Sequence, residues 1–320
     1  IMKLLTCLTE FMRQEKPDLL VLIDYPDFNW RLAKKAKALG IPVFSYIPPS
    51  AWAWRQGRAK ECVKWADEFV AIFPHELPVY EAAGANIEFL GNPLVDAVKP
   101  ELSPSQALAY FKIPTDKTVI LMLPGSRKQE IELLLPAMLG AAKELLAERP
   151  DTVFMLPVAD GVNEARLKEL IISANVPVKL TYDNRYALMH IATAAMATSG
   201  TVVMEAALLG LPCVVLYRLS PVSYFIGRLL VHVKNFSLPN ILLGETFETE
   251  LLQDEVTPEN IKKEMLKLYK GQEHRTLVLA KLKQAADKLG KPGAATRIAA
   301  KILAAARRFK VADAAIGGRK

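Results

Sequence analysis

Cysteine and histidine are scarce in this chain of 320 residues. Its three cysteines, Cys7, Cys62 and Cys213, are odd in number and form no CxxC pair, and its four histidines are scattered. This excludes a disulfide framework, argues against a metal site built on Cys or His, and favours a reducing, cytoplasmic environment. The chain also lacks any apolar run near the roughly 18 residues that a membrane-spanning helix requires.

Two nucleotide-binding signatures are also missing from the sequence. No GxGxxG motif follows a predicted strand, and no GxxxxGK[ST] motif occurs in the chain. The first absence argues against a dinucleotide-dependent oxidoreductase, and the second argues against a P-loop NTPase. Apolar residues make up 51% of the chain, which excludes a disordered protein and allows a large hydrophobic core.

The net charge of +7 is unevenly distributed. Residues 261–320 carry 16 Lys and Arg against 4 Asp and Glu, whereas residues 1–260 carry 25 against 30. The tail is therefore strongly basic, and the rest of the chain is mildly acidic. A basic tail is typical of contact with an anionic partner, such as a membrane surface or a nucleic acid, but also of a solvated helix face.

Short β-rich runs alternate with helical periods, which predicts βαβ units and parallel sheets. We expect a first domain over residues 1–98, a Pro-rich linker at 91–104, a second domain over 104–290 and a basic helix within 291–320. The first residues resemble the middle of a helix without an N-cap, so we expect the natural protein to carry further residues upstream. The predicted strands, followed by the final helix, are Leu19–Asp24, Pro42–Tyr46, Glu68–Ile72, Ile87–Leu90, Thr118–Leu123, Thr152–Leu156, Val178–Leu180, Ala195–Thr198, Pro212–Leu216 and Ala294–Phe309.

Two strand-to-helix turns in the second domain are rich in small residues. Small residues let backbone N–H groups approach phosphate oxygens, a helix N-terminus favours negative charge, and an arginine adds a bidentate donor. A glutamate one turn into the second helix is placed to accept hydrogen bonds from a ribose diol. The structural alternative is a pair of tight turns in which Arg127 pairs with Glu130. The candidate binding residues are Gly125, Ser126, Arg127, Ser199, Gly200, Thr201 and Glu205.

Two segments of the first domain carry further candidates. Asp24 ends an apolar strand, where burial would raise its pKa and make it a usable general base, although a structural role is equally open. Asp27 and Asn29 either cap the next helix or contact a substrate. Trp54 and Trp52 either stack on a sugar ring or contact an acyl chain, or they form an aromatic pair that caps the core, and Arg55 would meet a phosphate.

An apolar segment at 237–244 contains a single amide side chain, that of Asn240. An amide in such surroundings is either buried against a ligand or caps the turn that follows in a loop packed on the core. Both interpretations of Asn240 are open from the sequence.

Taken together, these segments resemble the lipid-A-disaccharide synthases, a family of GT-B glycosyltransferases. The resemblance spans about residues 15 to 260, and the motifs are highly specific in combination. The chain lacks the strand and the GE-x-SGD turn with which the family begins, and it has Asn92 where the family usually has His. The matching motifs are IDYPDFN at 23–29, AKALGIPV at 36–43, WAWRQGR at 52–58, LPGSR at 123–127, SGTVVMEAALLGLP at 199–212, YRLSP at 217–221, SLPNILLG at 237–244 and ELLQDEVTP at 250–258.

The resemblance implies an α/β protein of GT-B type, with two Rossmann-like domains that face each other across a cleft and a final helix that returns to the first domain. It implies an inverting transfer from UDP-2,3-diacylglucosamine to 2,3-diacylglucosamine 1-phosphate (lipid X), without a metal or a cofactor. In that reaction Asp24 would be the base, Arg127 would contact the diphosphate, and Glu205 would hold the ribose. Asn240 would lie close to the nucleotide.

The acyl chains of both substrates imply work at a membrane surface. We expect a peripheral enzyme on the cytoplasmic face of the inner membrane, with the basic tail near anionic lipid. We expect no nucleic-acid partner, and a homodimer is open. The apolar stretch 224–230 either contacts the membrane or belongs to the core. Two alternatives to the synthase stay open: a UDP-sugar epimerase of the same fold, and an inactive fragment that binds nucleotide.

Overall fold

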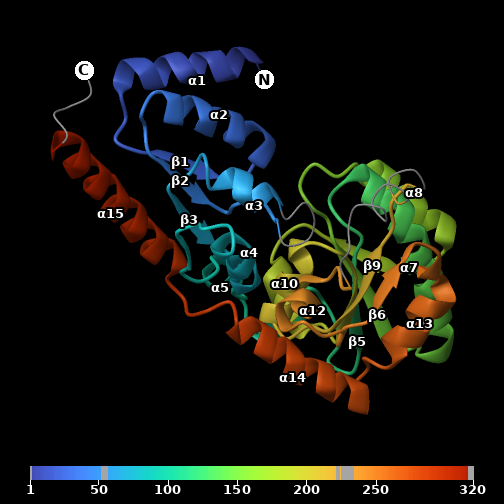
Figure 1. The fold of residues 1–320 in the computed structure, drawn as a ribbon. Helices are drawn as coiled ribbons and strands as arrows, with labels where there is room; N and C mark the ends of the chain where they lie inside the picture. Colours follow the sequence, from blue (N-terminus) through green and yellow to red (C-terminus); the bar gives the residue numbers. More distant parts are fainter. Residues whose placement is uncertain (1, 52–56, 221–223, 225–233, 316–320) are drawn as a thin grey trace. The chain divides into compact units, whose positions relative to one another are not determined.

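The described residues of the computed structural model, 2–51, 57–220, 224 and 234–315, divide into two compact units. The first unit contains the chain up to Asp96 and again from Leu289, and the second contains the chain from Ala97 to Lys288. Each unit is built on a parallel sheet with helices on its faces (Figure 1). The parallel α/β architecture that the alternating pattern predicts is therefore confirmed.

The first unit has a four-stranded parallel sheet in the order β1-β2-β3-β4. Successive side chains of a strand point to opposite faces of the sheet. Phe69 of β3 and Phe44 of β2 point to different faces and belong to two different hydrophobic cores. One face packs against α1, α2, α3 and α4 around Phe69 and Tyr80. The elements are α1 Met2–Glu15, β1 Leu20–Ile23, α2 Pro26–Ala38, β2 Val43–Tyr46, α3 Gly57–Cys62, β3 Glu68–Ala71, η1 Pro74–Glu76, α4 Leu77–Glu81, β4 Ile87–Phe89 and α5 Leu94–Ala97.

The long helix α15, Ala294–Ala315, covers the other face of this sheet (Figure 1). Its residues Ala294, Ile298 and Ala305 share a core with Phe44 of β2 and Val70 of β3. The sharp turn before α15 is fixed by the carboxylate of Asp96, which accepts the N–H of Gly293 at 2.9 Å.

The basic side chains of α15 meet carboxylates of the same unit. Arg308 forms an ion pair with Glu68, whose side chain is only 3% exposed, and the Lys301 ammonium lies 2.5 Å from the Glu88 carboxylate. Lys310 pairs with Asp18 at 3.1 Å. Part of the basic excess of the tail is therefore neutralised within the unit, so the tail is neither a purely solvated face nor wholly free for an anionic partner.

Removing the Arg308 guanidinium should destabilise the first unit. Arg308→Ala leaves the buried Glu68 carboxylate with Lys301 alone, at 3.7 Å. Breaking a fully buried pair costs about 3–5 kcal/mol; because Arg308 is half exposed, we expect about 2 kcal/mol less unfolding free energy. Denaturant unfolding beside Arg307→Ala, a change at the exposed neighbouring arginine, measures this; equal losses in the two variants would contradict the expectation.

The second unit has a six-stranded, all-parallel sheet in the order β10-β9-β8-β5-β6-β7. The chain starts at the centre with β5, builds outwards through β6 and β7, and returns beside β5 with β8. This is the order of a doubly wound nucleotide-binding fold, in which ligands bind where the direction of winding reverses, between β5 and β8. The strands are β5 Thr118–Leu123, β6 Thr152–Pro157, β7 Val178–Thr181, β8 Ala194–Thr198, β9 Cys213–Tyr217 and β10 Glu250–Leu252.

Helices cover both faces of this sheet, which is why β8 is buried along its whole length and β5 along all but its first residue. One cluster of buried residues joins Leu121 and Ala195 of the central strands to Leu188 of α9 and Val203 of α10. The helical elements are α6 Pro104–Tyr110, α7 Lys128–Glu148, α8 Glu164–Ala174, α9 Arg185–Ile191, α10 Thr201–Leu208, α12 Leu238–Leu243, η2 Gln253–Glu255, α13 Pro258–Leu266 and α14 Glu273–Asp287.

All nine strands predicted from the sequence are present, and each end lies within one residue of its predicted position. The tenth strand, β10, was not predicted. It has only three residues, Glu-Leu-Leu, which are too few to display an alternating pattern, and it pairs only with β9 at the edge of the sheet. The predicted linker at 91–104 contains a short helix, α5, and the final helix extends six residues beyond Phe309.

Candidate active site

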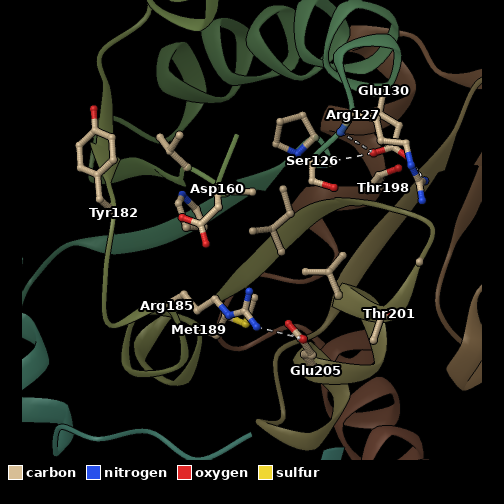
Figure 2. Close-up of a pocket in the computed structure, with 18 of the residues that line it drawn as sticks. Ser126, Arg127, Glu130, Asp160, Tyr182, Arg185, Met189, Thr198, Thr201 and Glu205 are labelled. Atoms are coloured by element: carbon tan, nitrogen blue, oxygen red, sulfur yellow. Dashed lines mark hydrogen bonds and ion pairs between the residues drawn. The ribbon is translucent and has the colours of Figure 1, made fainter. Parts of the chain in front are cut away.

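A pocket of about 490 Å³ opens at the carboxyl ends of the central strands of the second unit. It is lined by the turns after β5 and β8, together with residues that follow β6 and β7. Figure 2 shows Ser126, Arg127, Glu130 and Thr198 at one end of the pocket and Arg185 and Glu205 at the other. Seven predicted site residues line this one pocket: Gly125, Ser126, Arg127, Ser199, Gly200, Thr201 and Glu205.

The turn after β5 brings a glycine against a glutamate of the following helix. Gly125 has φ +110°, a left-handed conformation that favours glycine, and a Cβ there would lie 2.8 Å from the Cβ of Glu130. The Glu130 carboxylate accepts the N–H of Ser126 at 3.1 Å and that of Arg127 at 3.2 Å. The same carboxylate pairs with the Arg127 guanidinium at 2.7 Å, as the structural interpretation of this turn expected.

The turn after β8 leaves the start of α10 without a side-chain cap. Gly200 is the N-cap residue of α10 and has no side chain, and open space surrounds the position of a Cβ there. The hydroxyl of Ser199 donates instead to the Phe236 carbonyl at 2.8 Å, which ties this turn to the segment before α12. The uncapped start of α10 lines the pocket through Gly200, Thr201 and Val202, and the dipole of a helix favours an anion at such a position.

The carboxylate of Glu205 is held at the other end of the pocket. Its side chain is 11% exposed and forms an ion pair with Arg185 at 3.3 Å. Tyr186 donates a hydrogen bond to the same carboxylate oxygen at 3.4 Å. Desolvation lowers the pKa of the Arg185 guanidinium, but its hydrogen bond to Tyr186 and the charge of Glu205 outweigh that effect and raise it.

Several pocket residues were missed by sequence reasoning. Asp160, Tyr182 and Arg185 line the pocket, but each comes from a loop or a helix start without a distinctive motif. Thr198 also lines it and belongs to the turn that the sequence located, although it was not among the candidate residues. Position alone was the available signal, because residues that follow β6 and β7 lie at the same sheet edge as the two turns. Tyr182 donates a hydrogen bond to Glu164, which raises the pKa of the phenol.

Asn240 does not line this pocket. It is fully buried in α12, where its amide donates to the Glu248 carbonyl at 2.9 Å and to the Glu250 carboxylate at 2.7 Å. Its oxygen accepts the N–H groups of Phe247 and Glu248. With its hydrogen bonds used inside the protein, Asn240 holds the turn that follows α12, as the structural interpretation of this segment expected. Its place close to the nucleotide stays a prediction.

Asp24 and its neighbours occupy the end of β1 in the first unit. Asp24 is exposed, so the burial on which its role as a base was first argued is absent. Asp24 and Tyr25 both have positive φ, at 51° and 44°, which is unusual for consecutive residues other than glycine. Backbone strain of this kind concentrates at functional sites and requires support from its surroundings.

The expected helix caps at Asp27 and Asn29 are not formed as predicted. The N-cap residue of α2 is Tyr25, which makes no side-chain cap. Asn29 instead donates to the carbonyl of Asp24 at 2.7 Å, so it supports the strained turn. Asp27 lies in the first turn of α2 and accepts a hydrogen bond from Arg58 at 3.1 Å.

Three other sequence expectations have distinct outcomes. Trp54 and Arg55 lie outside the described residues, as does most of the apolar stretch 224–230. Asn92 is buried, and its amide donates to the Ile72 carbonyl at 2.9 Å while its oxygen accepts the Leu94 N–H at 2.9 Å.

Within the described part of the chain, no group of three or more His, Cys, Asp or Glu side chains is arranged to hold a metal, and no helix is long and apolar enough to cross a membrane.

Comparison with known protein families decides the affiliation of this chain. Residues 1–301 match the family model described as lipid-A-disaccharide synthetase. The chain belongs to the lipid-A-disaccharide synthase family. A relative named lipid-A-disaccharide synthase, from Syntrophus aciditrophicus, is 43% identical over 293 residues, which cover 91% of this chain and 76% of the relative. The match confirms the prediction of a glycosyltransferase of lipid A biosynthesis.

Solved structures with a similar fold support the GT-B architecture. A putative UDP-N-acetylglucosamine 2-epimerase from Listeria monocytogenes aligns with a TM-score of 0.63 at 19% identity, covering 94% of this chain and 77% of the epimerase. The UDP-GlcNAc 2-epimerase of Neisseria meningitidis, bound to UDP-GlcNAc, gives 0.64 at 17% identity, with coverage of 93% and 80%. At such low identity these likenesses confirm the GT-B fold of the synthase family member and say nothing of its substrate.

Proposed function

We propose that this lipid-A-disaccharide synthase family member transfers 2,3-diacylglucosamine from UDP to the 6-hydroxyl of lipid X. The observation that carries the proposal is the pocket at the winding reversal of the second unit, where two helix N-termini and Arg127 converge. The products are a β(1→6)-linked disaccharide 1-phosphate and UDP. Binding of a UDP-sugar is supported by the fold shared with enzymes whose solved structures hold UDP or UDP-GlcNAc.

The pocket offers a different group for each part of the donor. The diphosphate would accept hydrogen bonds from Arg127 and from the N–H groups that begin α7 and α10, which are preorganised for negative charge. Thr198 adds a buried hydroxyl at the same end of the pocket. Glu205, fixed by Arg185 and Tyr186, would accept the ribose hydroxyls.

The acceptor 6-hydroxyl is a weak nucleophile and needs a base within about 3 Å. We assign that role to Asp24, which follows a strand end and sits in a strained turn of a motif shared with the family. The acceptor oxygen forms a bond to the anomeric carbon, the bond from that carbon to the diphosphate breaks, and the configuration inverts. The acceptor proton passes to the Asp24 carboxylate, and the negative charge leaves with UDP.

Release of UDP from the acylated donor, measured with and without lipid X, tests this function. A synthase releases UDP at an appreciable rate only with the acceptor and accumulates the acylated disaccharide. A UDP-sugar epimerase, the alternative of the same fold, changes the donor without any acceptor. Binding of UDP without turnover in either case would indicate a nucleotide-binding chain that lacks activity.

Turnover should survive a chelator. The charge on the leaving UDP would be met by Arg127 and by the α7 and α10 N-termini, whose dipoles favour anions. Turnover rates measured with and without EDTA test this, and we expect the two rates to be equal. Turnover that stops in EDTA and returns with Mg²⁺ or Mn²⁺ would contradict this account of the leaving group.

The acyl chains of both substrates also lead us to propose peripheral action at an anionic membrane surface, on the cytoplasmic face of the inner membrane. The basic side chains of α15 that remain exposed, such as Arg307, support electrostatic attraction to such a surface. Co-sedimentation with vesicles of anionic and of neutral lipid tests the proposal. A homodimer stays a prediction, which the molar mass in solution tests.

A further inference from the structure

The geometry points to Glu130 as an internal anion that occupies the diphosphate subsite and competes with the phosphates of the bound nucleotide. This inference rests on the proposed donor site and assigns a further residue to it. Glu130 lies three residues after Arg127 in the first turn of α7, and its side chain is 23% exposed. Glu130 need not take part in the chemical step to compete with the phosphates in this way.

The Glu130 carboxylate makes the contacts that a phosphate would make. One of its oxygens accepts the N–H groups of Ser126 and Arg127 at 3.1 and 3.2 Å, and the other accepts the Arg127 guanidinium at 2.7 Å (Figure 2). Backbone amides at a helix start, together with an arginine, form the usual donor set for a phosphate group. A phosphate that takes these donors must therefore displace the carboxylate.

Gly125 makes this arrangement possible. Glu130 packs directly over Gly125, where any larger residue would collide with the carboxylate. Gly125 thus leaves room for the Glu130 side chain in the empty site and for a phosphate in the occupied site, so the turn accommodates an anion whether or not the nucleotide is bound.

A second observation at the same end of the pocket indicates a ligand. Thr198 is 5% exposed and lines the pocket, yet its hydroxyl has no hydrogen-bond partner among the described residues. A buried hydroxyl without a partner is costly, and a bound phosphate oxygen would satisfy it. Glu130 engages the amides of the β5 turn but leaves Thr198 and the start of α10 unsatisfied, so it substitutes for only part of the diphosphate.

Competition of this kind has a consequence for turnover. UDP must leave after each reaction, and a carboxylate that returns to the amides of Ser126 and Arg127 lowers the free energy of the empty site. Removing its charge should therefore tighten UDP binding and slow UDP release. KM for the donor and kcat should both fall in such a variant.

Glu130→Gln tests the inference, because it removes the charge while keeping the shape of the side chain and one oxygen acceptor. Calorimetric titration of UDP should give about tenfold tighter binding than in the unchanged protein, since a charge-assisted competitor is lost. Uridine, which lacks phosphates, should bind both proteins equally. Glu132→Gln is the matched control, because Glu132 carries the same charge on the same helix but pairs with Arg166 outside this pocket.

The outcomes separate this inference from the proposed function. If the unchanged protein fails to bind UDP, the proposed donor site is wrong. If it binds UDP and Glu130→Gln binds equally or more weakly, with the control unchanged, Glu130 is only a helix cap and the inference is overturned. A crystal structure of the unchanged protein with UDP gives a reading that needs no variant: Glu130 should leave the Ser126 and Arg127 amides, and a carboxylate that stays there would overturn the inference.

Discussion

Asp24→Asn is expected to lose most of the turnover while UDP binding stays close to normal. Loss of a general base costs on the order of 10²–10⁴ in rate. The change should leave the turn intact, because the turn is held through the backbone: the Asp24 N–H donates to Tyr46, and its carbonyl accepts from Asn29. Asparagine also tolerates the left-handed conformation that this position has at φ 51°, which alanine would not.

Initial rates with saturating donor and lipid X, beside UDP titration, measure the effect. Asp18→Asn is the matched control, since Asp18 precedes β1 in the same unit and pairs with Lys310. Near-normal turnover of Asp24→Asn would eliminate Asp24 as the base. The neighbouring carboxylate of Asp27 would then be examined in the same assay.

Arg127→Ala should weaken the binding of UDP by about tenfold to a hundredfold and slow the reaction as well. Hydrogen bonds to charged groups are worth about 1.5–3 kcal/mol, and about 1.4 kcal/mol corresponds to a factor of ten in affinity. The Arg127 side chain is 81% exposed and its one ion pair, with Glu130, lies at the edge of the pocket. Its removal should therefore cost little stability.

Titration of UDP into Arg127→Ala and Lys128→Ala separates a specific contact from a general loss of charge. Lys128 is the next residue and lines a different hollow between α7 and α8. Equal affinities of Arg127→Ala and the unchanged protein would mean that Arg127 serves only its surface pair with Glu130. A uniform loss in both variants would indicate long-range electrostatics instead of a direct contact.

Local sequence signals determined much of the fold and of the donor site. The apolar run at 118–123 followed by Pro, Gly and Ser predicts a buried strand, a tight turn and a helix start, and all three are present. The same reasoning located the turn at 198–201. Parallel strands align their carboxyl ends, so these two turns were expected to meet, and they line one pocket. The specific motifs around them also led to the right family.

Tertiary structure decided which side chains are free to act. Asn240 had two open interpretations, and only the approach of Glu248 and Glu250 showed that its amide is fully used. Asp24 follows an apolar strand, yet the packing of the first unit leaves it exposed.

Partners distant along the chain explain the remaining differences. Arg185 meets Glu205 at one end of the pocket, and Arg308 of the basic tail meets Glu68 of a central strand. Secondary structure depends on hydrogen bonds and side-chain periods within a few residues, which the sequence displays directly. The pairing of a charge depends on which elements pack together, and that is fixed by the burial of apolar faces across the whole chain. The sequence by itself therefore determined most of the elements, the two turns of the pocket and the family, whereas burial and pairing of the site residues were decided by the tertiary structure.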